Sequence, residues 1–205
     1  NKMGLISNGT TIFDTGAMAA GLGSSMTFIK KLTASDSANL TFHNGSSDVV
    51  FDNTYKSYLF IYTEIHPATD GANFVFQTNN VGGSGFNETM TTTCFRSYHG
   101  EDDSSGFGYK GDGDQAQGTS FQGLAFSVGN GNSENCSGYL YVYNPSSTVF
   151  ATHYMGQNNT RTASSESEHD FSGGYFNTTA ALDEIQFKFS SGNVGAGTIS
   201  LYGIA

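Results

Sequence analysis

The sequence lacks tryptophan, has only two prolines and two cysteines, and is poor in charge. Charged residues make up 13%, about half of the usual share. Eight Lys and Arg stand against 18 Asp and Glu, which gives a net charge of −10. Such a chain repels phosphate backbones, so we expect no nucleic acid partner. No apolar run approaches the roughly 20 residues that span a bilayer, so we expect no membrane insertion.

Good helix formers are scarce, whereas 17 Phe, 11 Tyr and 27 Gly are present. Aromatic residues suit pleated, half-buried surfaces, and short strands need frequent turns that contain glycine. At 205 residues the chain can bury a core without splitting into several domains. Composition and length therefore predict one large all-β domain.

The two cysteines, Cys94 and Cys136, show neither a C-x-x-C nor a metal-like spacing. Two buried or unpaired thiols are the favoured interpretation, and a single disulfide stays open. Residues 1–25 show no secretory pattern, because Asn8 and Asp14 are among the polar residues that interrupt any apolar core. Two explanations for the missing secretory pattern stay open: a signal peptide has been removed, or the protein leaves the cell in a particle that is released by lysis.

Alternation with a period of two is clearest in Glu184–Ser190. Ile185, Phe187 and Phe189 share one face, which predicts a strand with one face on the core and one in water. Thr198–Ile204 alternates in the same way after a short turn. We expect these two segments to form a closing antiparallel pair.

The longest predicted strand, Lys56–Ile65, is apolar on both faces. One face is predicted to carry Leu59, Ile61 and Ile65, and the other Tyr58, Phe60 and Tyr62. This pattern predicts a central strand covered on both sides, in which another subunit supplies one cover.

Ser137–Tyr143 places Leu140 and Val142 on one face and Tyr139, Tyr141 and Tyr143 on the other. A stripe of aromatic residues on a strand is more often cross-strand packing than a ligand platform. Packing is therefore the favoured interpretation of this tyrosine stripe.

Further strands are predicted at Met26–Leu32, Asn39–Phe42, Asn73–Gln77, Thr91–Tyr98, Phe121–Val128, Val149–Met155 and Asp170–Phe176. About ten strands with turn signals between them are typical of a sandwich or a barrel. We therefore expect an antiparallel β-sandwich in residues 26–205, preceded by an N-terminal arm or first strand in residues 1–25. Short helical turns are expected only at Thr15–Ala20 and Thr179–Glu184.

Two long polar segments are predicted to be loops, His99–Gly118, with its core at Glu101–Asp114, and Gln157–Asp170. Long polar loops gather at the ends of sandwiches and carry recognition, so a binding site is expected there. Asp112-Gly113-Asp114 begins like a calcium loop, but Ala116 and Gly123 occupy ligand positions of an EF-hand. A solvated acidic loop is the favoured interpretation. Ca²⁺ held by Glu101, Asp102, Asp103, Asp112 and Asp114 stays open.

The motifs that could carry catalysis lack their structural context. Gly106–Gly111 fits G-x-G-x-x-G, but acidic and glycine-rich loops flank it in place of a strand and a helix. The five histidines (His43, His66, His99, His153 and His169) show no metal-binding spacing, and no G-x-S-x-G is present. We therefore expect no enzymatic activity, no catalytic residues and no cofactor.

The C-terminal stretch from Asp183 to Asn193, DEIQFKFSSGN, is followed by GTISLYGIA from Gly197 to Ala205. It resembles the ending of virion structural proteins of tailed bacteriophages, particularly marine ones. The segment from Tyr58 to Asp70 resembles the "YLFxxxNIHPATD" segment of the same group, so the likeness spreads over most of the chain from Met26 onward.

This resemblance implies a capsid-decoration or tail-fibre component of the virion, and it brings no catalytic residues to carry over. It also implies a lectin-like, jelly-roll fold and a symmetric homo-oligomer such as a trimer, in contact with other virion proteins. The alternative is a carbohydrate-binding module that attaches to a glycan of the host surface.

Overall fold

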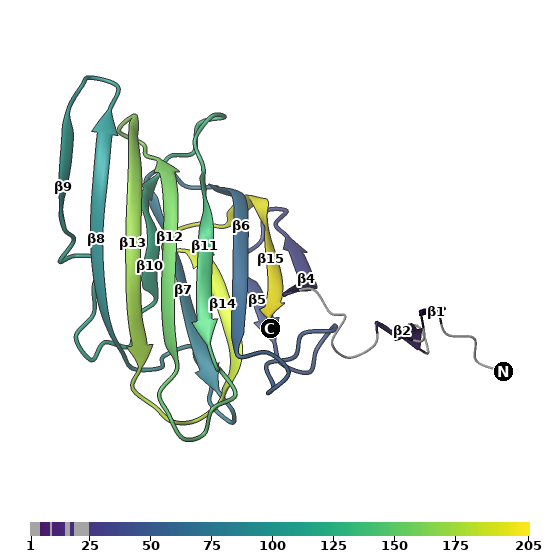
Figure 1. Ribbon diagram of the computed structural model, residues 1–205. Coiled ribbons are helices and arrows are strands. Elements are labelled where there is room, and N and C mark those ends of the chain that lie inside the picture. The colour runs from purple at the N-terminus through teal and green to yellow at the C-terminus, as the bar shows by residue number, and fades with distance from the viewer. Residues whose placement is uncertain (1–4, 9, 15–16, 19–24) are drawn as a thin grey trace.

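The computed structural model describes residues 5–8, 10–14, 17–18 and 25–205. Its main body is an antiparallel β-sandwich of an eight-stranded and a four-stranded sheet, and the described residues contain no helix. The all-β prediction is confirmed. Figure 1 shows the larger sheet in front, with β7, β10 and β14 of the smaller sheet behind its middle.

The eight-stranded sheet is antiparallel throughout. From edge to edge its strands are β4 (Met26–Thr33), β15 (Val194–Ile204), β6 (Ser57–Pro67), β11 (Cys136–Tyr143), β12 (His153–Arg161), β13 (Glu166–Phe176), β8 (Met90–Gly100) and β9 (Ser105–Tyr109). The order of the four-stranded sheet is β10 (Gln122–Val128), β7 (Ala72–Asn80), β14 (Leu182–Phe189) and β5 (Leu40–His43).

Three short N-terminal strands form a separate antiparallel sheet, namely β1 (Leu5–Ser7), β2 (Thr10–Asp14) and β3 (Ala17–Met18). The helical turn expected at Thr15–Ala20 lies mostly outside the described residues, and Ala17 and Met18 belong to β3. The helical turn expected at Thr179–Glu184 is wrong, because residues 179–181 form a non-helical connection with a bend at Ala180, and β14 begins at Leu182.

Aromatic side chains between the two sheets make the core. Phe187 of β14 lies at its centre, within 6.3 Å, centroid to centroid, of the rings of Phe42, Phe60, Phe74 and Phe76. Ile185 and Phe189 point inward with Phe187, as the alternation predicted. The phenylalanine content thus serves to fill the space between two pleated faces.

The expected pairing of the last two strands is wrong. β14 pairs with β5 and β7 in the small sheet, whereas β15 pairs with β4 and β6 in the large one. The turn at 190–193 therefore crosses from one sheet to the other. Period-two alternation reports which face of a strand is buried and carries no information on which strand lies beside it.

The two-faced strand β6 is a central strand of the large sheet, as predicted, and cover of its outer face by another subunit stays a prediction. A bulge at Glu64, where φ is +54°, turns Ile65 to the inner face with Tyr58, Phe60 and Tyr62. On the outer face Leu59 is buried by residues of its own chain. Its register partners Tyr141 and Tyr202 lie on the two neighbouring strands of the same sheet.

Both predicted loops contain strands. Most of Gln157–Asp170 belongs to β12 and β13, joined by a short turn, and β12 begins at His153 rather than at Val149. His99–Gly118 contains the edge strand β9. The polar composition led to the prediction of loops. These strands carry polar side chains on both faces, so they show no apolar alternation in the sequence.

Candidate ligand-binding site

The outer face of the eight-stranded sheet carries a continuous group of aromatic side chains. Tyr139, Tyr141 and Tyr143 of β11 project from it, because Leu140 and Val142 occupy the alternate, inward positions. The rings of Tyr141 and Tyr143 are parallel, with centroids 6.0 Å apart, and Tyr139 meets Tyr141 edge to face at 5.7 Å. The predicted face assignment of the tyrosine stripe is confirmed.

A second aromatic group lies two to three strands away. Phe171 of β13 and Phe95 of β8 are register partners, and their rings are parallel with centroids 4.6 Å apart. The His169 ring contacts Phe171 from two residues away, at 4.5 Å. Sequence reasoning missed this group, because its members come from strands that are more than 70 residues apart in the chain.

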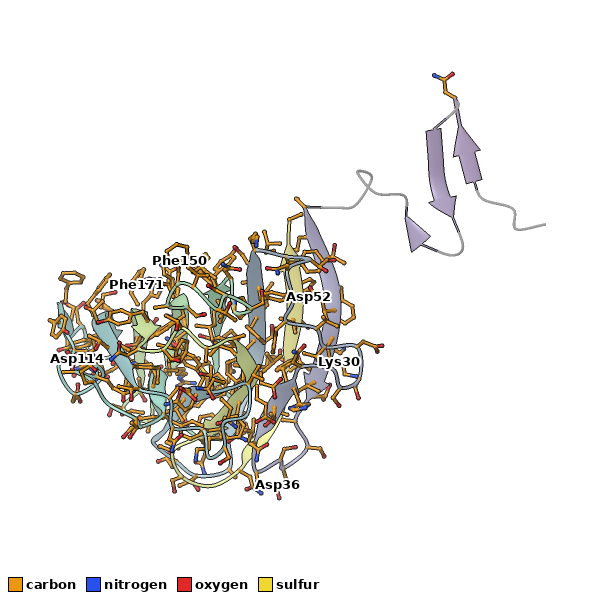
Figure 2. The ribbon with its side chains drawn as sticks, turned by 90° about the horizontal axis from the view of Figure 1, so that it is seen from below. Lys30, Asp36, Asp52, Asp114, Phe150 and Phe171 are labelled. Carbon is orange, nitrogen blue, oxygen red and sulfur yellow. The ribbon has the colours of Figure 1, made fainter. Side chains whose placement is uncertain are left out.

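Gly173 opens a hollow between the two aromatic groups. It is the register partner of Met155 on β12 and of Thr93 on β8, so the row of side chains is interrupted there. The hollow has a volume of about 350 Å³. Its lining side chains are Thr93, Phe95, Tyr139, Tyr141, Tyr143, Met155, Gln157 and Phe171. In Figure 2, Phe171 lies on the outer side of the large sheet.

The packing of the protein itself does not explain a glycine at position 173. A Cβ there would come no closer than 3.6 Å to any other atom, which is an ordinary van der Waals contact, and φ is not positive. Glycine inside a strand costs roughly 0.5–1 kcal/mol relative to alanine. Such a glycine often marks a place that a ligand approaches closely.

One hydrogen bond orients the polar group at the rim of the hollow. The phenol of Tyr139 donates to Oε1 of Gln157 over 2.5 Å. Among the residues that the structure describes, Nε2 of Gln157 has no hydrogen-bond partner and stays free to donate. The lining contains no Asp, Glu, Lys or Arg. The hollow therefore combines apolar walls with a single oriented amide and no charge.

The acidic residues considered for calcium are engaged separately. Glu101 accepts a hydrogen bond from the guanidinium of Arg161, and Asp102 accepts one from the backbone N–H of Ser104. Oδ1 of Asp103 lies 3.4 Å from Nε2 of His99. Further along, Asp112 pairs with Lys110, and Asp114 accepts from Tyr109. In the described part of the chain, no three His, Cys, Asp or Glu side chains gather in a way that could hold a metal ion.

The glycine motif Gly106–Gly111 lies on β9 and in the turn after it. Gly106 packs against the ring of Tyr98, where a Cβ would come within 2.6 Å of the ring. A pyrophosphate needs the N-terminus of a helix after such a motif, and the next element here is the strand β10.

A buried acidic pair on the inner face of β13 was also missed from the sequence. Glu168 binds Arg96 at 2.6 Å, and Asp170 accepts from Nδ2 of Asn158 at 3.1 Å. Burial, then the charge of Glu168 and a hydrogen bond with it, raises the pKa of Asp170 to about 8. Acidic residues at alternate positions, Glu166, Glu168 and Asp170, were the available signal.

Oxygen atoms of both carboxyl groups in this pair, Oε1 of Glu168 and Oδ1 of Asp170, are buried without another partner. The raised pKa keeps Asp170 protonated at neutral pH, so this carboxyl group can donate to the Glu168 carboxylate. The pair lies under the sheet, on the side opposite the hollow, and does not line it. We therefore assign it to the stability of the fold and not to the ligand site.

No protein-family model, curated protein sequence or solved structure matches the chain. The described part of the chain contains no helix long and apolar enough to cross a membrane. The fold and the hollow together define a β-sandwich with an uncharged aromatic concavity on the outer face of its larger sheet.

Proposed function

We propose that this domain is a non-enzymatic carbohydrate-binding module, and that the hollow at Gly173 receives a neutral sugar. The observation that carries the proposal is the glycine itself, which leaves a space between aromatic groups that no packing contact requires. Sugar binding needs apolar rings, a few oriented polar groups and a concavity. All three are present here.

The size and charge of the hollow favour this class of ligand over others. Its volume of about 350 Å³ is at the low end of the range for small-molecule pockets, about 300–1,000 Å³, which suits a single sugar unit. The uncharged lining and the net charge of −10 disfavour anionic ligands. Aromatic rings contact the C–H faces of a sugar well, because their faces carry negative partial charge.

The test is a glycan array followed by calorimetry with any glycan that binds. Tyr141→Ala removes a wall of the hollow, and we expect it to weaken binding by at least about tenfold. Phe28→Ala is the matched control, since this ring is 56% exposed on the opposite edge strand β4 and does not line the hollow. An array that stays blank, or equal loss in the two variants, would contradict the proposal.

The second candidate is a structural virion protein, a capsid decoration or a tail-fibre component that assembles as a homo-oligomer. Two observations favour it: the resemblance of the C-terminal segment to phage virion proteins, and the exposed pair Val149 and Phe150 beside β12. In Figure 2, Phe150 lies on the same side of the sheet as Phe171. The lectin-like jelly-roll topology and the trimer implied by the resemblance remain predictions.

The two candidates are compatible, since an attachment fibre can assemble and bind a glycan. Sedimentation measures the assembly separately from binding. If Val149 and Phe150 contact a neighbouring subunit, replacing both by Ser lowers the oligomeric state and leaves sugar binding in place. A monomeric wild-type protein that is absent from purified particles would contradict the structural candidate.

A further inference from the structure

The bottom of the hollow is mainly apolar and offers little for a hydroxyl group to bind. Its floor is Gly173, and the side chains around it are the apolar Phe95, Phe171 and Met155. The hydroxyl of Thr93, the polar side-chain group nearest the floor, interacts with the phenol of Tyr109 on the neighbouring strand. The backbone of Gly173 lies in the ladder between β12 and β8. A hydroxyl pushed into this space would lose its water partners without gaining others.

The group that fits the floor is therefore small and apolar, such as a methyl group. At the rim, Gln157 supplies the complementary requirement. Its Oε1 is occupied by Tyr139, so the amide presents the two hydrogens of Nε2 towards a ligand. A donor that is fixed in this way needs an acceptor, and a carbonyl oxygen is the strongest neutral one that sugars carry.

A methyl group attached directly to a carbonyl is an acetyl group. We infer that the sugar unit held in the hollow is an N-acetylated amino sugar, whose methyl group rests on Gly173 and whose carbonyl oxygen accepts from Nε2 of Gln157. This inference rests on the proposed function and narrows it. A binding site that hydrogen-bonds a polar group of its ligand discriminates strongly against an analogue without that group. The polar atom of the site is left unpaired when the analogue binds.

The first experiment compares two probes that differ only in the acetamido group. Calorimetric titration with the β1,4-linked dimer of N-acetylglucosamine and with that of glucose should give at least about tenfold tighter binding of the acetylated dimer. Equal affinity for the two dimers would overturn the inference and leave the proposed function intact. Failure of every glycan to bind contradicts the proposed function itself.

The second experiment removes the donor without changing the shape of the side chain. Gln157→Glu keeps an acceptor for the phenol of Tyr139 but places an oxygen where Nε2 was, so the preference for the acetylated dimer should fall to about twofold or less. Gln186→Glu is the matched control, because it makes the same chemical change on the four-stranded sheet. A preference that survives Gln157→Glu overturns the role of the amide.

The third experiment fills the floor. Gly173→Val places a branched side chain in the hollow, and we expect it to abolish binding of the acetylated dimer, while the midpoint of urea unfolding confirms that the variant is folded. A deoxy sugar such as fucose carries a methyl group but no carbonyl. If it binds as tightly as the acetylated dimer, the methyl group alone decides recognition, and the inference is overturned.

Discussion

Gly173 and Gly174 are neighbours in β13 that face opposite sides of the sheet and have opposite reasons for being glycine. A Cβ on Gly174 would meet the carbonyl oxygen of Thr91 at 2.6 Å and the methyl group of Thr92 at 2.7 Å. A Cβ on Gly173 would meet nothing closer than 3.6 Å. Packing thus requires the second glycine, and the first leaves the hollow open.

This difference predicts opposite effects of the same substitution on stability. Gly174→Ala forces backbone and side chains apart, and we expect it to lower the free energy of unfolding by about 1–3 kcal/mol. Gly173→Ala should leave it unchanged or raise it by up to about 1 kcal/mol, because alanine suits a strand better than glycine. Urea unfolding measures both. Equal losses in the two variants would show that position 173 is also a packing position.

The sequence was sufficient for the fold class and for the facing of single strands. In Glu184–Ser190 and Ser137–Tyr143, alternation identified the buried side chains, because burial of one face is a local property of a strand. Alternation failed to predict which strands β14 and β15 pair with, and it placed Ile65 on the wrong face of its strand. Both features depend on residues that are distant in the sequence, because these residues set the order of the sheet and the position of a bulge. Gly197, at φ +113°, packs against the carbonyl of Glu64, and neither residue predicts the other in the sequence.

The candidate site was predictable only in part. The tyrosines of β11 were visible as a stripe, but they were interpreted as packing, and the expected binding site lay in the polar loops. What makes the stripe a wall of a hollow is Gly173 on a strand two positions across the sheet. A glycine in a glycine-rich chain gives no signal of that kind until the register of β12 and β13 is known.

The core should depend strongly on Phe187. Its ring contacts four other phenylalanine rings, so Phe187→Ala leaves a large cavity and should cost about 3–5 kcal/mol of unfolding free energy. Phe150→Ala removes the same side chain from a site that is 72% exposed and should change stability by less than about 0.5 kcal/mol. Thermal unfolding of the two variants makes the comparison, and a loss below about 1 kcal/mol for Phe187→Ala would contradict this description of the core.

The two cysteines should be inert in the folded protein. Both are free and fully buried, and burial raises the pKa of Cys94 to about 12 and that of Cys136 still higher. Because the thiolate is the reactive form, neither should react with a thiol reagent at pH 8 until the chain unfolds. Ellman's reagent counts the reactive thiols, and we expect none in buffer and two in denaturant. Rapid reaction of the native protein, or a count of none in denaturant without reductant, would contradict the free, buried thiols.

The raised pKa of Asp170 makes stability depend on pH. The pKa of Asp170 is raised from 3.8 to about 8, so the folded chain keeps a proton that the unfolded chain releases. The unfolding free energy therefore falls as pH rises from about 4 to about 8, and this contribution is constant above that range. One proton changes it by about 1.4 kcal/mol per pH unit, so the loss is on the order of several kcal/mol.

Asp170→Asn removes this titration while its amide can still donate to Glu168 and accept from Asn158. We expect the variant to lose the decline between pH 5 and pH 8 and to be more stable than the wild type at pH 8.5, because no second charge has to enter the core. Urea unfolding at intervals of one pH unit gives both curves. Asp48→Asn, at an exposed position without a side-chain hydrogen bond, is the control and should follow the wild type. Parallel curves for Asp170→Asn and the wild type would show that the buried pair does not hold the proton.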